Sequence, residues 1–222
     1  MLEPIERLVL RDARVVDPSQ GLDAVASVFV ERGQIAVVAR SESERNQAEH
    51  GAFAGARTYD AQGLILLPGL IDLRAHLGQP GYEYKEDVRS GLSAAMAGGY
   101  VGVCCLPDTA PINDNRAVTD SLRQASSDVG PELLPIAAVT RGMKGEVLSE
   151  IGDLKEGGAV AVSDVGRYLQ RADVMRRALQ YCRTFDLPLM QQPQEPTLIQ
   201  GGQMHEGSVS TRLGLRGWPR PA

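Results

Sequence analysis

Short apolar runs separated by polar residues make up the first sixty positions of the chain. The runs occupy positions 8–10, 15–16, 28–30 and 35–38, and Gly33 separates the last two. Runs of this length bounded by turn residues are typical of β-strands, so we predict a small antiparallel sheet. The segment over residues 40–56 is polar and has no apolar stripe, which indicates a loop or a short surface helix.

From residue 63 onward, short apolar runs alternate with longer amphipathic ones. The predicted strands occupy residues 64–73, 100–106, 133–139, 159–163 and 187–191. The predicted helices occupy residues 85–97, 115–127, 146–155 and 173–185. Strands that alternate with helices form parallel sheets with helical crossovers, either open or closed into a barrel. We therefore predict an α/β chain with a small sheet domain over residues 1–62 and a βα domain over residues 63–222.

The charge pattern narrows the range of partners. The chain carries 23 Lys and Arg and 28 Asp and Glu residues, a formal net charge of -5, and its basic residues form no cluster. A protein that binds nucleic acid or an anionic membrane needs such a cluster, so neither partner is expected.

The chain start, the apolar runs and the cysteines together predict a cytoplasmic location. No apolar run reaches the ~18–20 residues that cross a bilayer, and the acidic, proline-containing start is unlike a secretory signal. The three cysteines, two of them adjacent at Cys104 and Cys105, are not expected to form a disulfide framework. We predict a cytoplasmic protein with buried, reduced thiols.

One motif favours the barrel over the open sheet. Residues 68–76 read Pro-Gly-Leu-Ile-Asp-Leu-Arg-Ala-His, an apolar strand that ends in polar residues. Active sites of α/β barrels lie at the carboxyl ends of the strands. Residues two apart on a strand share a face, so we expect Arg74 and His76 to point together into the barrel mouth.

This motif resembles the P-G-x-I-D-x-H-x-H signature of the amidohydrolase superfamily. Later segments resemble the dihydroorotase family, among them Gln79-Pro80-Gly81, Pro107-Asp108-Thr109-Ala110-Pro111, Ser163-Asp164-Val165-Gly166 and Leu213-Gly214-Leu215. The resemblance implies a metal-dependent (β/α)8 barrel with a small β-sandwich built from both chain ends. A complete barrel takes about 250 residues. We therefore expect an incomplete TIM barrel of about five βα units, truncated at the C-terminus and preceded by part of the β-sandwich.

The resemblance also implies an activity, the interconversion of dihydroorotate and carbamoyl-aspartate in pyrimidine biosynthesis. In this chemistry a metal-bound hydroxide attacks the cyclic amide, because coordination brings the pKa of water close to neutral. Of the implied metal ligands only His76 is retained. Arg74 replaces the first histidine of the H-x-H pair, Val165 replaces the second of two adjacent acids, and Gln192 replaces a histidine at the end of the next strand.

Two implied substrate contacts are substituted as well. Gly78 stands where an arginine would grip the substrate carboxylate, and Asp108 stands where the family has an asparagine. A carboxylate at that position would repel an anionic substrate. With no catalytic residue intact, the chain resembles the non-catalytic dihydroorotase-like members. We expect no cofactor and a structural role in a homo- or hetero-oligomer, with aspartate transcarbamoylase catalytic chains as the partner.

Two other functions stay open at this point. One is an active dihydroorotase or related cyclic amidase with an atypical zinc site. The other is an anion-binding module in which Arg74 holds a ligand in the former active-site pocket.

Each candidate residue also has a simpler interpretation. Arg74 is expected to form an internal salt bridge with an aspartate. The candidate partners are Asp72, Asp108 and Asp164. His76 is expected to form a hydrogen bond with a neighbouring residue, because a single histidine does not make a metal site. Lys144, which follows the third predicted strand, is expected to be a surface-loop lysine, with ligand contact as the alternative.

Overall fold

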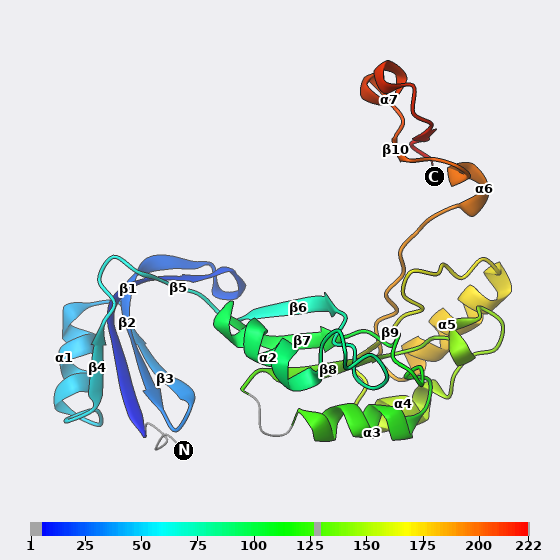
Figure 1. Cartoon of the computed structure of the whole chain (residues 1–222). Coiled ribbons are helices and arrows are strands. Elements are labelled where there is room, and N and C mark those ends of the chain that lie inside the picture. The colour runs from blue at the N-terminus through cyan, green and yellow to red at the C-terminus, as the bar shows by residue number, and fades with distance from the viewer. Residues whose placement is uncertain (1–5, 127–129, 222) are drawn as a thin grey trace. The chain divides into compact units, whose positions relative to one another are not determined.

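A computed structural model describes residues 6–126 and 130–221 of the chain (Figure 1). The chain divides into two compact units, Met1–Gly69 and Leu70–Ala222, and each is described by itself. The predicted division lies after residue 62, whereas the structure divides the chain after Gly69. The difference arises because Ile65 and Leu66 pair with the first strand of unit 1.

Unit 1 is a five-stranded mixed sheet. Its strands are β1 (Arg7–Asp17), β2 (Leu22–Glu31), β3 (Gln34–Ala39), β4 (Arg57–Asp60) and β5 (Ile65–Leu66). The sheet order is β3-β2-β1-β4, and β5 also pairs with β1. The pairs β1–β2 and β2–β3 are antiparallel, whereas β4 and β5 run parallel to β1. The prediction of a purely antiparallel sheet is therefore wrong.

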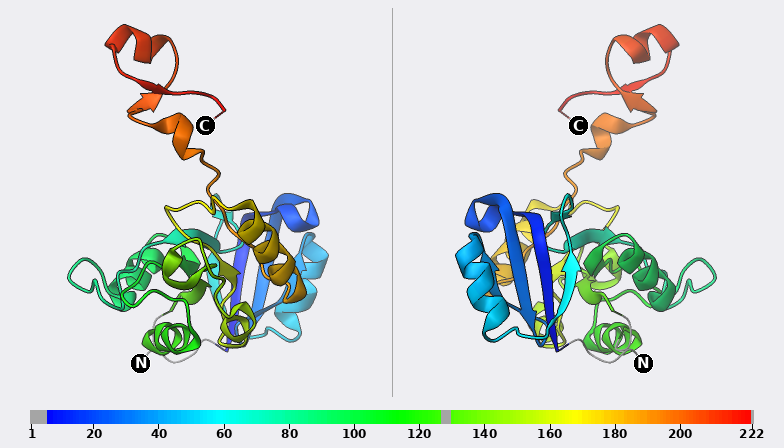
Figure 2. Two further views of the ribbon diagram at one scale, coloured as in Figure 1. Left: turned by 90° about the vertical axis from the view of Figure 1, so that its right-hand side faces the viewer. Right: turned by 90° about the vertical axis from the view of Figure 1, so that its left-hand side faces the viewer.

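Helix α1 (Glu42–His50) forms within the polar segment for which the sequence left a loop or a short helix open. Ser41 caps it, because the Ser41 hydroxyl accepts from the amide of Glu44 while the Glu44 carboxylate accepts from the amide of Ser41. α1 lies beside the sheet in Figures 1 and 2. Ala48 of α1 packs against the cluster in which the rings of Phe29 and Phe53 meet edge to face at 5.1 Å. The described part of unit 1 contains this one sheet, and the β-sandwich stays a prediction.

Unit 2 is built on a parallel sheet, as the alternation of strands and helices predicts. Its strands, in sheet order, are β6 (Leu70–Ala75), β7 (Tyr100–Cys105), β8 (Glu132–Ala137) and β9 (Ala161–Val162). All three neighbouring pairs are parallel, and Leu189 extends the sheet through one parallel bridge to Val162. The helices between them are α2 (Val88–Ala97), α3 (Arg116–Ala125), the 3-10 turn η2 (Arg141–Met143), α4 (Ile151–Glu156) and α5 (Ala172–Thr184).

The strand predicted over residues 64–73 is wrong in its first part. Ile65 and Leu66 form β5, which pairs with Arg14 and Val15 of unit 1, and the strand of the parallel sheet begins only at Leu70. Pro68, which lies between the two, has no amide hydrogen to donate to a sheet. The apolar run is therefore interrupted and shared between the two units.

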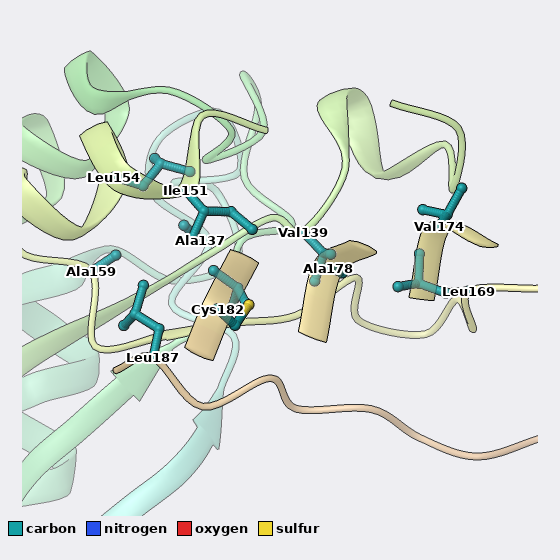
Figure 3. Close-up of a cluster of buried hydrophobic side chains, with 11 residues drawn as sticks. Ala137, Val139, Ile151, Leu154, Ala159, Leu169, Val174, Ala178, Cys182 and Leu187 are labelled. Atoms are coloured by element: carbon teal, nitrogen blue, oxygen red, sulfur yellow. The ribbon is translucent and has the colours of Figure 1, made fainter. Parts of the chain in front are cut away.

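The main core of unit 2 holds the ends of β8 and β9 in place. It contains eleven buried side chains, including Ile151 and Leu154 of α4 and Val174, Ala178 and Cys182 of α5 (Figure 3). These residues are spaced three or four apart, so each helix turns one apolar face toward the sheet. The packing fixes the start of α5 close to the segment that follows β9.

The last part of the described chain forms small local elements. These are α6 (Pro196–Ile199), β10 (Met204–His205), α7 (Ser208–Leu213) and β11 (Gly217–Trp218). β10 and β11 are parallel partners. Among residues 6–126 and 130–221, no helix has the length and apolarity needed to cross a membrane.

Candidate functional site

The candidate site residues lie just after the carboxyl ends of the parallel strands. His76 follows β6, Asp108 follows β7, and Asp164 follows β9, while Arg74 lies near the end of β6 itself. Because the strands are parallel, their carboxyl ends meet at one edge of the sheet. This edge is where α/β folds bind ligands and carry out chemistry.

The three substituted metal-ligand positions come together. Arg74, Val165 and Gln192 line one cavity of about 170 Å³, called the Arg74 cavity below. The rest of its lining is Leu106, Ser163, Asp164, Gly166, Met190 and Gln191. The three positions thus line one cavity, although Arg74 and Gln192 are more than a hundred residues apart in the sequence.

His76 does not line that cavity. It lines a second one of about 390 Å³, called the His76 cavity, together with Gly78, Asp108 and Lys85. Arg74 and His76, which were expected to point together into the barrel mouth, thus line two different cavities at the carboxyl edge of the sheet. Leu106 lies between the two cavities and lines both.

The His76 imidazole is held by the substituted residue Asp108. Its Nδ1 lies 2.7 Å from Oδ2 of Asp108. This contact connects the end of β6 to the end of β7. It is the neighbour hydrogen bond that was the alternative to metal ligation, and it occupies one of the two ring nitrogens.

The Arg74 guanidinium has no acidic partner in the described part of the chain. The backbone N–H of Arg74 donates to Oδ1 of Asp72 at 2.8 Å, but the side chain forms none of the ion pairs found among residues 6–126 and 130–221. The expected internal salt bridge is therefore wrong. Two of its candidate partners, Asp108 and Asp164, are engaged by His76 and Thr140 instead.

Asp164 joins the end of β9 to the end of β8. Its carboxylate accepts hydrogen bonds from the amides of Val139 (2.8 Å) and Thr140 (3.1 Å), and from the Thr140 hydroxyl. The residue is only 2% exposed. Burial raises the pKa of this carboxyl group, and the hydrogen bonds from Thr140 and Val139 oppose that increase. Thr140 was missed from the sequence, although it is the first polar residue after a buried apolar run.

The cysteines on β7 are not positioned as nucleophiles. Cys104 and Cys105 are both buried, as predicted, and neither forms a disulfide. Burial raises the pKa of the Cys105 thiol to about 12. A thiol with such a pKa carries almost no thiolate near neutral pH, which excludes the usual activated-cysteine chemistry.

The donor set does not fit a transition-metal site. A catalytic zinc site takes three protein ligands from His, Asp, Glu or Cys. Among residues 6–126 and 130–221, no three such side chains are grouped closely enough to hold a metal ion. Around the Arg74 cavity the corresponding positions present a guanidinium, an isopropyl group and a neutral amide. None of these replaces an anionic or imidazole ligand.

The fold and the position of the site define the class of protein. The structure is similar to L-hydantoinase (dihydropyrimidinase) from Arthrobacter aurescens, with a TM-score of 0.69 and 17% identity over 87% of this chain and 42% of that chain. It is also similar to the beta-aspartyl dipeptidase of Fervidobacterium islandicum, with a TM-score of 0.54 and 16% identity over 83% of this chain and 48% of that chain. The chain therefore shares its α/β fold, with a curled parallel sheet that forms part of a barrel, with the matched parts of these two proteins.

Sequence comparison narrows the class to one family. The family model described as Dihydro-orotase-like matches residues 63–221. The chain is 44% identical to the dihydroorotase of Geobacter metallireducens over 213 residues, and 42% identical to that of Syntrophotalea carbinolica over 214 residues. Each alignment covers 96% of this chain and 48% of the relative. The chain belongs to the dihydro-orotase-like family, and it spans about half the length of the curated relatives that it matches.

Replacing Asp164 tests how its carboxylate is held. The folded state binds the Asp164 proton more tightly than the unfolded state does, because its pKa is raised. The stabilisation from this proton is fully present below the unfolded-state pKa and is lost as the pH rises through the folded-state pKa. Relative to Asp164→Asn, which does not titrate, the free energy of unfolding of the parent chain should therefore fall as the pH rises above the unfolded-state pKa of about 4. Urea unfolding of both proteins over a series of pH values measures the difference.

Asp173 is the matched control for that experiment. It is exposed, and a hydrogen bond from Arg171 is the main reason that its pKa is lowered. The parent should gain stability relative to Asp173→Asn as the pH rises, which is the opposite sign. A parent chain that also gains stability relative to Asp164→Asn with rising pH would show that the Asp164 environment is described incorrectly.

Proposed function

We propose that this chain is a dihydroorotase-like protein of pyrimidine biosynthesis that does not catalyse the metal-dependent reaction and serves instead as a structural subunit. The single observation that carries the proposal is the composition of the Arg74 cavity. Three of the positions that hold metal ligands in the family pattern lie together there, and they are occupied by Arg74, Val165 and Gln192.

The charge of Arg74 opposes metal binding directly. A unit positive charge about 4 Å from a divalent cation is repelled by roughly 8 kcal/mol at an effective dielectric constant of about 20. An arginine side chain stays protonated at all physiological pH values, so it cannot relieve this repulsion by losing its proton. In the described structure no carboxylate pairs with the Arg74 guanidinium to offset its charge.

The substrate side of the site is altered in the same direction. Asp108 presents a carboxylate to the His76 cavity, and its hydrogen bond with His76 keeps both groups engaged with each other. Gly78, in the same cavity, supplies no side chain to hold a substrate carboxylate. Relative to the family pattern, the site therefore gains the negative charge of Asp108 and loses the positive charge of an arginine at Gly78. Both changes disfavour an anionic substrate.

Restoring the ligand pattern tests the proposal without relying on enzyme activity. The triple variant Arg74→His, Val165→Asp and Gln192→His places two imidazoles and a carboxylate at the edge of the Arg74 cavity. We expect its affinity for zinc, measured by competition with a chromogenic chelator, to exceed that of the parent by at least about a hundredfold.

The double variant Val165→Asp and Gln192→His is the matched control, because it adds two ligands and keeps the cation. It should recover only a small part of the gain, since Arg74 still repels the metal. The proposal fails if the parent chain already binds zinc as tightly as the triple variant, because an atypical but working zinc site would then exist in this chain.

The structural role is proposed to involve association with other subunits in the cytoplasm. Three apolar side chains on β6 and β7 are exposed and support this proposal, namely Ile71, Leu73 and Val101. In the described chain β6 has a sheet partner, β7, along one edge only. Exposed apolar surface and an unpaired strand edge both favour association.

The proposed partner is the catalytic chain of aspartate transcarbamoylase, as the family resemblance implies. Size-exclusion chromatography of the two proteins together should show co-elution, and Leu73→Asp should weaken it by placing a charge on the apolar strand. The exposed change Lys155→Gln on α4 is the control and should leave co-elution unchanged. Separate elution at micromolar concentrations would contradict this part of the proposal.

A second candidate function is supported by the unpaired guanidinium of Arg74. An arginine that faces a cavity without an acidic partner is suited to bind a carboxylate with two parallel hydrogen bonds. Carbamoyl-aspartate and orotate are therefore expected to raise the melting temperature of the parent chain and to have no effect on Arg74→Gln. If neither compound at millimolar concentration shifts the parent, the Arg74 cavity does not bind these anions.

A further inference from the structure

A third cavity of about 420 Å³ lies in unit 2 beside the Arg74 cavity. The segment after β8 contributes Lys144 and Glu146 to its lining, and the segment between β9 and α5 contributes Arg167 and Arg171. It is called the Lys144 cavity below. Asp164 and Gly166 line both this cavity and the Arg74 cavity, so the two adjoin. Nothing in the family pattern used above assigns a role to Lys144 or Arg167.

Two cations in the Lys144 cavity lack acidic partners. Lys144 and Arg167 are both exposed, and neither takes part in an ion pair with another residue of the described ranges 6–126 and 130–221. Arg167 is nevertheless fixed in place, because one Nη donates to the carbonyl oxygen of Met143 at 3.1 Å. Its remaining N–H groups are free to bind a ligand.

The acidic groups around the cavity are mostly engaged. The Asp164 carboxylate accepts three hydrogen bonds from Val139 and Thr140. Arg171 is bound through two nitrogens to Asp173, at 3.0 and 2.7 Å. Glu146 is the one lining carboxylate without a hydrogen bond to the described residues. The side chains left free to bond a ligand are therefore two cations, Lys144 and Arg167, and one carboxylate, Glu146.

The backbone adds to the preference for an anion. α5 has 13 residues, and Arg171, the residue immediately before it, lines the cavity. The positive end of the helix dipole is therefore on this side. Gly145 and Gly166 both line the cavity with positive φ angles, 73° and 68°, and no atom lies within 4 Å of the place where a side chain would begin. A ligand can therefore approach the backbone closely at both glycines.

We infer that the Lys144 cavity binds the phosphate group of a small phosphomonoester. A phosphomonoester carries close to two negative charges at neutral pH, which matches two available cations better than a single carboxylate does. Backbone N–H groups at the N-terminus of a helix are well suited to bind a phosphate group. The volume of about 420 Å³ is within the range of cavities that hold a small organic molecule. The inference is independent of the proposed structural role.

Titration of the full chain with glycerol 3-phosphate, followed by calorimetry, tests the inference. Lys144→Gln removes one cation and should weaken binding by at least about tenfold, and Arg167→Gln should do the same. Glu146→Gln removes the available carboxylate and should tighten binding. Inorganic phosphate should bind the same site, since the charged group is shared.

Two controls separate this site from other cations on the molecule. Arg74→Gln should leave the affinity for glycerol 3-phosphate unchanged, which distinguishes the Lys144 cavity from the Arg74 cavity. Lys155→Gln, an exposed lysine on α4, should also leave it unchanged. The Lys144 side chain is exposed and forms no hydrogen bond or ion pair with the described residues, so Lys144→Gln should keep the melting temperature of the parent even if Arg167→Gln unfolds.

The outcomes are decisive in both directions. Binding that weakens in Lys144→Gln, tightens in Glu146→Gln and is unchanged in Arg74→Gln supports the site. Absence of binding by the parent at 10 mM phosphomonoester, on the order of the weakest useful affinities, overturns the inference. Equal affinity of the parent and Lys144→Gln overturns it as well, because the ligand then binds elsewhere.

Discussion

The buried carboxylate of Asp164 is the group on which the arrangement at the carboxyl edge of the sheet depends. A carboxylate that is removed from water is costly unless its oxygens are hydrogen-bonded. Asp164 meets this requirement with the amides of Val139 and Thr140 and with the Thr140 hydroxyl. These bonds hold the end of β8 against the segment that follows β9. Because Asp164 lines both the Arg74 cavity and the Lys144 cavity, the walls of both depend on it.

Two of the carboxylates at this edge have protein partners. Asp108 is bonded to His76, and Asp164 is bonded to Thr140 and Val139. The one ionic group of this set that lacks a partner in the described chain is the cation Arg74. In the family pattern the same edge concentrates ligands for a positive ion. Here it presents an unpaired positive charge of its own, which supports the proposal that the Arg74 cavity suits an anion better than zinc.

Much of the βα unit could be predicted from local sequence. The strands β7 and β8 and the helices α2, α3 and α5 lie within a few residues of the predicted ranges, because their apolar residues recur with clear periods. Asp87 and Asn115 cap the starts of α2 and α3. Unit 1 was predicted less well. β4 reads Arg-Thr-Tyr-Asp and has no apolar pattern, so its parallel pairing with β1 is a long-range choice that local sequence does not reveal.

The candidate site, like the fold, combines features that short stretches of sequence predict with features that depend on long-range packing. The family resemblance assigned Arg74, Val165 and Gln192 to one site, and in the structure they line one cavity. The hydrogen bond between His76 and Asp108 joins residues that follow two different strands, so the pattern along one strand does not predict it. The Lys144 cavity depends on two loops brought together by the packing of α4 and α5, which no short stretch of sequence describes.

The central claim is that the strand-end site of this chain holds no catalytic metal. The most direct test is the zinc content of the purified chain after growth with zinc, measured by mass spectrometry together with dihydroorotate hydrolysis on the same preparation. The account predicts less than about 0.1 zinc per chain and no turnover. Zinc close to one per chain, released by a chelator together with hydrolytic activity, would contradict it.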